Sequence, residues 1–184
     1  MLQAARLRRI RAHLKAGGVI AYATESCFGF GCDPFNSRAV RSLLRLKQRP
    51  QQKGLIIIGA SLSQLEYLMR NVSPALRARA QAKWPGAHTW LVPASAHVPA
   101  WLRGRHERVA LRVPAHAGAR ALCAQTNLPL VSTSANRSSR VSIKTYRECI
   151  RQFGASTLVV PGRIGRRKRP STIADLLSGK LIRG

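Results

Sequence analysis

Cationic and hydroxyl side chains gather at four places in the sequence, each at the end of an apolar or amphipathic segment. These places are Thr24 to Gly29, Lys47 to Lys53, Arg112 to Pro114 and Ser132 to Asn136. Hydroxyls, backbone amides, Arg and Lys are the groups that hold phosphate and carboxylate oxygens in proteins. The four clusters therefore predict a pocket for a phosphorylated substrate that is anionic or zwitterionic.

Each cluster also has a plain structural interpretation when it is taken alone. Lys47-Gln48-Arg49 could be a solvated helix end, where the helix dipole favours cations. Ser132 to Asn136 could cap a following helix, Thr24 could be a turn residue, and Arg112 could pair with one of the few carboxylates. The clusters by themselves leave both interpretations open.

Several kinds of chemistry have no signature in the sequence. The Gly-x-Ser-x-Gly nucleophile motif and the Gly-x-x-x-x-Gly-Lys-Ser/Thr phosphate loop do not occur. The six acidic residues form no close pair and the five histidines show no ligand spacing, so we expect no metal site built by the protein. The four cysteines show neither zinc spacing nor disulfide-scaffold density, which favours a reducing cytoplasm. We expect catalysis by positioning and electrostatic stabilisation instead of a covalent intermediate.

The length and the charge of the chain indicate how many domains it forms and which partners it attracts. A chain of 184 residues, 45% of them apolar, can bury one core, so we expect a single domain over residues 1–184. The 32 basic and 6 acidic residues give a net charge of +26, which attracts polyanions at long range. The densest basic cluster, Arg163 to Arg169, lies in an expected loop from Pro161 to Pro170, and we expect it to contact a phosphate backbone or the tail of ATP. No segment is long and apolar enough to span a membrane.

Apolar periodicity predicts alternating helices and strands. Helices are expected at residues 2–16, 37–47, 61–69, 74–83, 118–126 and 142–153, with Ser37 as the N-cap of the second. Strands are expected at 19–22, 55–58, 88–92, 109–113, 130–133 and 157–160. This alternation favours an α/β fold with an open, mixed sheet, in which ligands collect beyond the strand ends.

Seven motifs occur in an order that points to one family. They are Thr24-Glu25 with Phe28-Gly29, Lys47-x-Arg49-Pro50, Lys53-Gly54-Leu55-Ile56, Trp84-Pro85-Gly86-x-x-Thr89, Arg112-x-Pro114, Ser132 to Asn136 and Ser171-Thr172-Ile173. Taken together they span nearly the whole chain, which resembles the short, single-domain members of the YrdC/TsaC family. The resemblance implies a YrdC-like fold, with a twisted α/β sheet, helices on its faces and a large basic concave cavity.

The resemblance also implies an activity, that of a threonylcarbamoyl-AMP synthase, which is a nucleotidyltransferase. Such an enzyme makes L-threonylcarbamoyladenylate and pyrophosphate from L-threonine, bicarbonate and ATP. Downstream threonylcarbamoyl-transferase proteins then form N6-threonylcarbamoyladenosine in tRNAs that read codons starting with A. The implied location is the cytoplasm, with no membrane partner.

The family roles carry over to this sequence by motif. Lys47 and Arg49 would be the catalytic residues and would bind ATP together with Ser134 and Asn136. The threonine site would be formed by five residues: Thr24, Thr89, Arg112, Ser132 and Ser171. Mg²⁺ would arrive with ATP and not in a dedicated protein site.

The sequence departs from the family pattern at Ser139, where a Gly is usual and would supply a special backbone angle beside the nucleotide. Two other functions remain as alternatives. The first is a non-catalytic maturation factor that binds tRNA or ribosomal RNA through the basic cavity. The second is the carbamoyl-adenylate chemistry of hydrogenase-maturation proteins, for which no preceding zinc-finger or acylphosphatase-like segment is present in the sequence.

Overall fold

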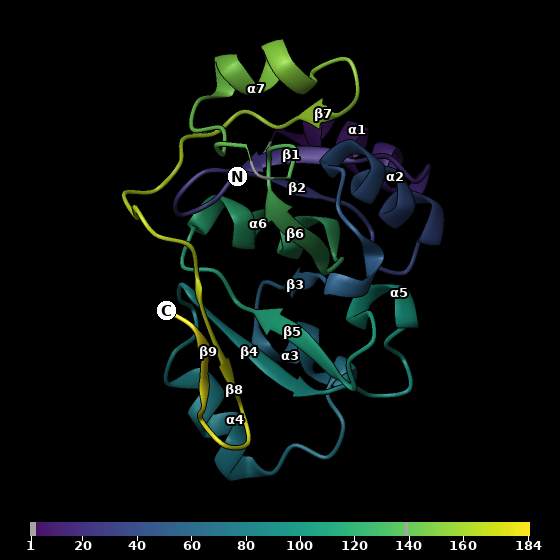
Figure 1. Cartoon of the computed structure of the whole chain (residues 1–184). Coiled ribbons are helices and arrows are strands. Elements are labelled where there is room, and N and C mark those ends of the chain that lie inside the picture. The colour runs from purple at the N-terminus through teal and green to yellow at the C-terminus, as the bar shows by residue number, and fades with distance from the viewer. Residues whose placement is uncertain (1–2, 139) are drawn as a thin grey trace.

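The sheet of the computed structural model is mixed and contains, among the described residues 3–138 and 140–184, nine strands (Figure 1). Their order across the sheet is β7-β1-β2-β6-β3-β5-β4-β8-β9. The pairs β1–β7, β3–β5 and β4–β8 are parallel, and the other neighbours are antiparallel. The bounds are β1 Ile20–Ala23, β2 Phe28–Gly31, β3 Ile56–Ile58, β4 His88–Pro93, β5 Arg108–Arg112, β6 Leu130–Ser134, β7 Leu158–Val159, β8 Thr172–Asp175 and β9 Leu181–Arg183. The expected mixed α/β class is confirmed.

Helices cover both faces of the sheet because alternate strand residues point to opposite sides. On one face, α1 and α6 pack over Ile20 and Tyr22 of β1. On the other face, α2 and α7 pack over Ala21 and Ala23 of the same strand. The helix bounds are α1 Ala4–Lys15, α2 Ser37–Lys47, α3 Leu62–Leu65, α4 Pro74–Gln81, α5 Ala100–Arg103, α6 Ala117–Thr126 and α7 Tyr146–Phe153, with 3-10 turns at Gln51–Lys53 and Glu66–Leu68.

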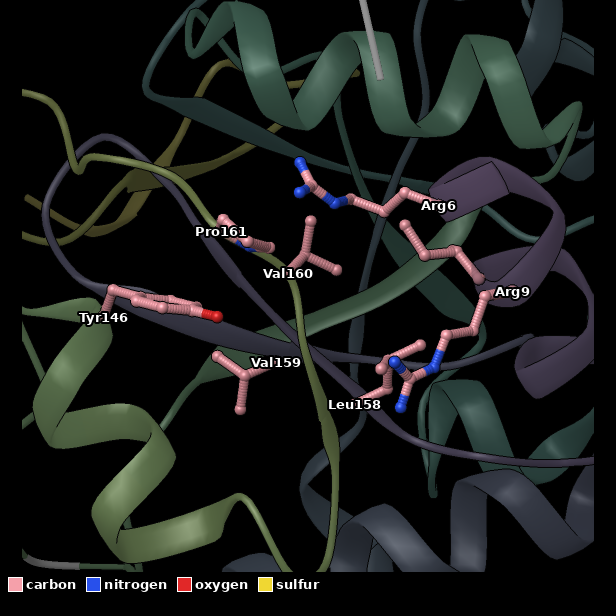
Figure 2. Close-up of a pocket in the computed structure, with 8 residues that line it drawn as sticks. Arg6, Arg9, Tyr146, Leu158, Val159, Val160 and Pro161 are labelled. Atoms are coloured by element: carbon pink, nitrogen blue, oxygen red, sulfur yellow. The ribbon is translucent and has the colours of Figure 1, made fainter. Parts of the chain in front are cut away.

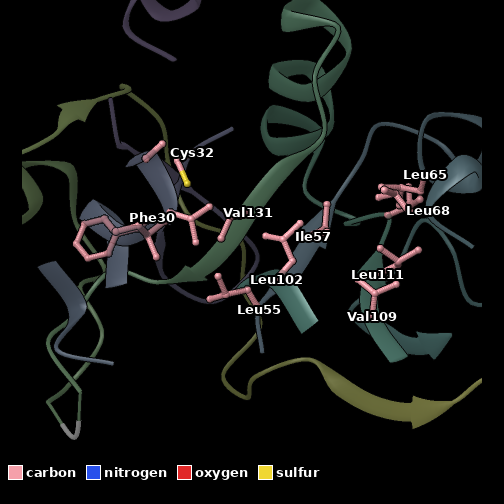
Figure 3. Close-up of a cluster of buried hydrophobic side chains, with 14 of the residues drawn as sticks. Phe30, Cys32, Leu55, Ile57, Leu65, Leu68, Leu102, Val109, Leu111 and Val131 are labelled. Carbon is pink, nitrogen blue, oxygen red and sulfur yellow. The ribbon is translucent and has the colours of Figure 1, made fainter. Parts of the chain in front are cut away.

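The larger apolar cluster runs through the middle of the sheet and holds its strands in register. Figure 3 shows Phe30 of β2, Val131 of β6, Ile57 of β3 and Leu111 of β5 following one another across this cluster. All four side chains are fully buried. The four adjacent strands β2, β6, β3 and β5 therefore form a fixed platform.

The structure differs from the expected helices by one or two residues at several ends, and more clearly in three of them. Asn36, not Ser37, is the N-cap of α2, because its Oδ1 accepts the Ala39 amide at 3.1 Å. The expected helix at 61–69 is divided into the four-residue α3 and a 3-10 turn. The expected helix at 142–153 begins only at Tyr146, because Thr145 caps it by accepting the Glu148 amide at 3.2 Å.

Four elements were missing from the sequence prediction. They are β2, α5, β8 and β9. β2 reads Phe-Gly-Phe-Gly, and its first two residues fall within the predicted polar cluster Thr24 to Gly29, but the segment forms a buried hairpin with β1. β8 and β9 follow the basic loop, and each is too short to show an alternating hydrophobic pattern that would identify a strand.

The segment from Pro161 to Pro170 contains neither helix nor strand, as expected. Its backbone is bonded to the β1–β2 turn, where the Gly165 amide donates to Thr24 O at 2.9 Å and the Arg167 amide to Glu25 O at 3.1 Å. A Cβ at Gly165 would lie 2.8 Å from Glu25 O, so only glycine permits this approach. In the described part of the chain, no helix is long and apolar enough to cross a membrane.

Candidate active site

A cavity of about 590 Å³ lies over the middle of the sheet. Strand register builds its floor: Gly29 of β2 pairs with Ser134 of β6, and Ser132 of β6 pairs with Ile56 of β3. Two residues further along β3, Ile58 pairs with Arg112 of β5. Three of the four predicted polar clusters therefore meet because β2, β6, β3 and β5 are neighbours.

The cavity walls are strongly basic. Seven basic residues line it: Lys47, Arg49, Lys53, Arg112, Lys144, Lys168 and Arg183. Among the described lining residues there is no carboxylate. Serine and threonine residues line the cavity beside these cations: Thr24, Ser26, Ser132, Thr133, Ser134, Ser138, Ser142 and Ser171. Such a surface binds an extended anion through many charge-assisted hydrogen bonds.

Lys47 joins two motifs of the predicted site, because it bonds to Ser134, which is 87 residues away in the sequence. Its Nζ donates to Ser134 O at 2.7 Å, Ser134 Oγ at 3.1 Å, Asn136 Oδ1 at 2.8 Å and Asn136 O at 3.3 Å. The residue is buried, and burial together with the nearby Arg49 lowers its pKa from 10.5 to about 8. Lys47 is thus not the solvated helix end that the sequence left open.

Arg49 reaches the cavity because Gln48 ends α2 in the left-handed conformation, with φ 52°. The Arg49 Nη2 donates to Gly54 O at 3.0 Å, while its buried Nε has no partner among the described residues. Burial, and next the nearby Arg183, lower the pKa of Arg49. Arg49 also lines the cavity, so the part of its guanidinium that faces the cavity can contact an anion.

Arg112 forms an ion pair with Glu25, and its Nε donates to Gly86 O at 3.0 Å. Glu25 is itself fixed before α6, because Oε1 accepts the Ala115 amide at 2.7 Å and the His116 amide at 3.3 Å. The plain interpretation, pairing with a scarce carboxylate, is therefore correct for Arg112. The residue also lines the cavity, so the two interpretations are compatible.

Arg183 was not predicted as a site residue. It lies on β9, and its Nη2 donates to Ser171 O at 2.9 Å and Ser171 Oγ at 3.3 Å. Burial, and next the nearby Arg112, lower the pKa of Arg183. The only sequence signal was an Arg near the end of the chain, since β9 itself was not predicted. Lys168 also lines the cavity and belongs to the basic cluster that was predicted to contact phosphate.

The hydroxyl residues hold fixed positions along the wall. Thr24 closes the β1–β2 turn, where Oγ1 donates to Cys27 O at 2.7 Å. The Ser132 hydroxyl accepts from Tyr22 at 2.8 Å, and burial raises the pKa of Tyr22, so the phenol keeps its proton. Thr89 is fully buried and donates to Ser171 Oγ at 3.0 Å, which places it behind the wall.

The structure therefore brings eight of the nine predicted site residues to one cavity, and Thr89 is the one outside its lining. Ser139, the departure from the family pattern, lies outside the described residues. In the described part of the chain, no group of three His, Cys, Asp or Glu side chains could hold a metal ion. The arrangement suits a substrate with several negative charges, held by cations and hydroxyls.

The fold and the site define an α/β protein with a basic, hydroxyl-lined cavity over the centre of a mixed sheet. The profile of the Sua5/YciO/YrdC family, described as telomere recombination, matches residues 12–184. The chain belongs to this family.

Three similar proteins place the chain more closely. The threonylcarbamoyl-AMP synthase of Methylobacillus flagellatus is 54% identical over 178 residues, which are 97% of this chain and 99% of that protein. The protein of the same name from Chromobacterium violaceum is 51% identical over 176 residues, 96% of this chain and 91% of its own length. The structure of P. abyssi Sua5 complexed with L-threonine is 29% identical with a TM-score of 0.87, over 95% of this chain and 52% of the Sua5 chain. This chain thus spans about half the length of that Sua5.

Proposed function

We propose that this protein is a threonylcarbamoyl-AMP synthase, which converts L-threonine, bicarbonate and ATP into L-threonylcarbamoyladenylate, pyrophosphate and water. The observation that carries the proposal is the single cavity of about 590 Å³ in which seven cations surround a row of hydroxyls. The names of the two bacterial relatives, each at least 51% identical, support the activity. The P. abyssi relative complexed with L-threonine supports the amino-acid substrate.

The nucleotide would lie along the wall that Lys47 organises. Lys47 and Arg49 would neutralise the triphosphate, and Ser134 and Asn136 would hydrogen-bond the nucleotide. Four hydrogen bonds from Lys47 Nζ keep the Ser134 to Asn136 segment in place. Mg²⁺ would enter as part of the ATP substrate, bound mainly by its phosphates.

L-Threonine would lie on the side of the cavity formed by Arg112. This guanidinium would hold the threonine carboxylate while its other face stays paired with Glu25. Thr24, Ser132 and Ser171 would surround the rest of the amino acid. Thr89 would contribute through Ser171, whose hydroxyl it fixes at 3.0 Å.

The reaction needs two bonds to form in this cavity. The threonine amine attacks the carbon of bicarbonate, water is lost, and an N–C bond gives the carbamate. A carbamate oxygen then attacks the α-phosphorus of ATP, and the bond to the bridging oxygen of the β-phosphate breaks, so that pyrophosphate leaves. Cations aimed at the phosphates stabilise the charge that develops on the leaving oxygen, which is electrostatic catalysis without a protein-bound intermediate.

The product is a mixed anhydride, which is an activated donor for a later group-transfer reaction. We place the reaction in the cytoplasm, in one domain over residues 1–184. Downstream transferase proteins would use the adenylate to form N6-threonylcarbamoyladenosine in tRNAs that read codons starting with A. A purely RNA-binding function is less well supported, because the two bacterial relatives carry the name of a synthase.

The test is release of pyrophosphate from ATP, measured with and without L-threonine and bicarbonate. We expect release to require both, and mass spectrometry to detect threonylcarbamoyladenylate. Arg49→Ala should abolish most of the activity, whereas Arg38→Ala, which changes an exposed arginine on the preceding helix α2, should leave it unchanged. Pyrophosphate release that is equal without threonine, or no release at all from folded protein, would refute the proposal.

A further inference from the structure

A second, smaller hollow lies between α1 and the beginning of α7, away from the active-site cavity. Its volume is about 210 Å³, and its lining consists of Arg6, Arg9, Ile10, Tyr146, Leu158, Val159, Val160 and Pro161. Figure 2 shows Arg6 and Arg9 reaching from α1 on one side and the Tyr146 ring reaching from α7 on the other, with the segment from Leu158 to Pro161 between them. The hollow has no part in the proposed synthase reaction.

The two arginines form a cationic wall that the protein does not neutralise. Arg6 and Arg9 are three residues apart on α1, so they lie on one side of the helix. Both side chains are exposed. Within the described residues, neither guanidinium makes a hydrogen bond or an ion pair. Each guanidinium carries five N–H donors, so this wall of the hollow holds ten donors without an acceptor among the described residues.

The opposite wall is aromatic and the floor is apolar. Tyr146 is 36% exposed at the start of α7, a helix that buries only Cys149 and Phe153. The floor is β7, an edge strand that pairs with β1 on one side. A partly exposed ring over an apolar floor is a surface on which a nucleobase stacks, and nearby arginines add contacts to its phosphate.

The hollow is continuous with the basic loop that leads to the active site. Pro161 lines the hollow and begins this loop, while Lys168 and Pro170 line the active-site cavity. Five of the seven residues from Arg163 to Arg169 are basic. A series of basic residues therefore lies along the chain between the two depressions. That spacing of charge fits a strand of phosphates better than a single small anion.

We propose that this hollow is a binding site for single-stranded RNA. One base stacks on Tyr146, the adjacent phosphates bind Arg6 and Arg9, and the strand continues along the Arg163 to Arg169 loop. The opening is roughly a third of the volume of the active-site cavity, which limits it to one nucleotide of the strand. This site would hold RNA beside the enzyme while the catalytic cavity stays free for ATP and threonine.

The test measures fluorescence anisotropy of a labelled oligouridylate of about ten nucleotides, a length within the range that single-strand binding sites cover. Arg6→Ala with Arg9→Ala should weaken binding at least tenfold. The matched control is Arg8→Ala with Lys15→Ala, which removes the same charge from exposed positions of the same helix outside the hollow. This control should weaken binding no more than about threefold, because it changes only the long-range field.

Two further measurements distinguish a specific RNA-binding site from non-specific electrostatic attraction. Loss of two phosphate contacts should reduce the slope of log K against log salt by about 1.4 in the Arg6/Arg9 variant. Tyr146→Ala and Tyr146→Leu should each weaken binding about tenfold, while Tyr146→Phe keeps the ring and should bind as the wild type does. Pyrophosphate release from ATP and thermal stability should be unchanged in all of these variants, so that failure here is distinct from failure of the proposed enzyme.

Several results would overturn the assignment. The first is equal weakening by the Arg6/Arg9 pair and the Arg8/Lys15 pair with no effect of Tyr146. The second is an RNA duplex that binds as tightly and with the same residue dependence. The third is AMP that displaces the oligonucleotide with the affinity of the full strand, which would make the hollow a mononucleotide site.

Discussion

Lys47 and the two arginines Arg49 and Arg183 line the same active-site cavity, but they differ in how completely the protein accepts their hydrogen bonds. The ammonium of Lys47 has four acceptors within reach, all from Ser134 and Asn136. Arg49 and Arg183, in contrast, lie close enough for the charge of Arg183 to lower the pKa of Arg49, and the Nε of Arg49 has no partner among the described residues. Lys47 thus holds the cavity wall together in addition to its proposed contact with the triphosphate, whereas each arginine keeps donors that no described residue accepts.

Side-chain chemistry explains this division. An ammonium is a compact charge with three donors, so a few carbonyl and hydroxyl oxygens saturate it. A guanidinium carries five donors in a rigid fork and keeps some of them free when backbone oxygens take one or two. Repulsion between neighbouring guanidiniums is relieved when a phosphate or carboxylate binds between them. The comparison predicts that Lys47 affects stability and activity together, while the arginines affect mainly activity.

Lys47→Met should have the largest effect, because it removes the cation and leaves the oxygens of Ser134 and Asn136 without their donor. We expect the free energy of unfolding to fall by about 2 kcal/mol, in the range for lost hydrogen bonds to a charged group. Pyrophosphate release should fall by roughly a hundredfold or more, the scale of losing one well-placed electrostatic group. Urea denaturation and the ATP assay measure the two. Lost activity with full stability would contradict the wall-forming role of Lys47.

Arg49→Gln should give the next largest loss, with a different signature. We expect kcat/KM for ATP to fall by roughly a hundredfold, because we propose that the Arg49 guanidinium binds the triphosphate. The free energy of unfolding should stay within about 0.5 kcal/mol or rise, since repulsion by Arg183 is removed. Arg183→Gln tests the reverse direction of the same pair. A destabilised Arg49→Gln protein would show that Arg49, like Lys47, serves the fold.

Much of this site could be predicted because its residues are concentrated in short motifs. Lys47 to Arg49 and Ser132 to Asn136 each contain several polar residues after a clear helix or strand, and the structure brings them together through β6 and α2. Arg112 could be found in the same way, at the end of the apolar strand β5. The mixed sheet could be predicted from the alternation of the longer elements.

The remainder depends on long-range pairing that local pattern does not encode. β9 is three exposed residues, and only its pairing with β8 brings Arg183 to Ser171. Thr89 and Ser171 are 82 positions apart, so only the parallel β4–β8 pairing shows that one lies behind the other. The choice of Asn36 over Ser37 as N-cap is a one-residue difference between two good caps.

Arg112→Lys should have a smaller effect that is confined to the amino acid. The Arg112 guanidinium pairs with Glu25 and bonds Gly86 O, and a single ammonium cannot serve both and a substrate carboxylate. We expect KM for threonine to rise about thirtyfold and KM for ATP to change less than about threefold, equivalent to roughly 2 and 0.6 kcal/mol. Steady-state kinetics with each substrate varied in turn measures both. An equal rise in the two values would place Arg112 between the substrates.

The pKa of Lys47 predicts opposite pH trends for activity and stability. Its folded pKa, about 8, is below the ordinary 10.5 because of burial and then Arg49, while the nearby Cys27 raises it. Activity should fall above pH 8, by about tenfold at pH 9, as the ammonium loses its proton. Between pH 8 and 10.5 the unfolded chain binds more protons at this group, so its contribution to stability rises.

Rate profiles and denaturation curves from pH 7 to 10 test these trends, with Lys47→Met as the reference for other titrating groups. The Cys27→Val variant removes the thiol and should move the alkaline limb to lower pH, because that thiol raises the pKa of Lys47. The alkaline decrease in rate could instead occur near pH 10 and stay in place in the Cys27→Val variant. That result would mean that Lys47 titrates as an ordinary surface lysine.

Thr89→Val should have the smallest effect, and it tests whether a hydroxyl behind the wall acts only through its neighbour. Valine keeps the shape but removes the bond from Oγ1 to Ser171 Oγ, so we expect the free energy of unfolding to fall by about 1 kcal/mol. The rate should fall about threefold, less than for Ser171→Ala, which removes a hydroxyl that lines the cavity. Arg183 would still hold Ser171 through the backbone carbonyl at 2.9 Å. If Thr89→Val is as damaging as Ser171→Ala and raises KM for threonine alone, Thr89 contacts the substrate directly, and the cavity must open further than this structure shows.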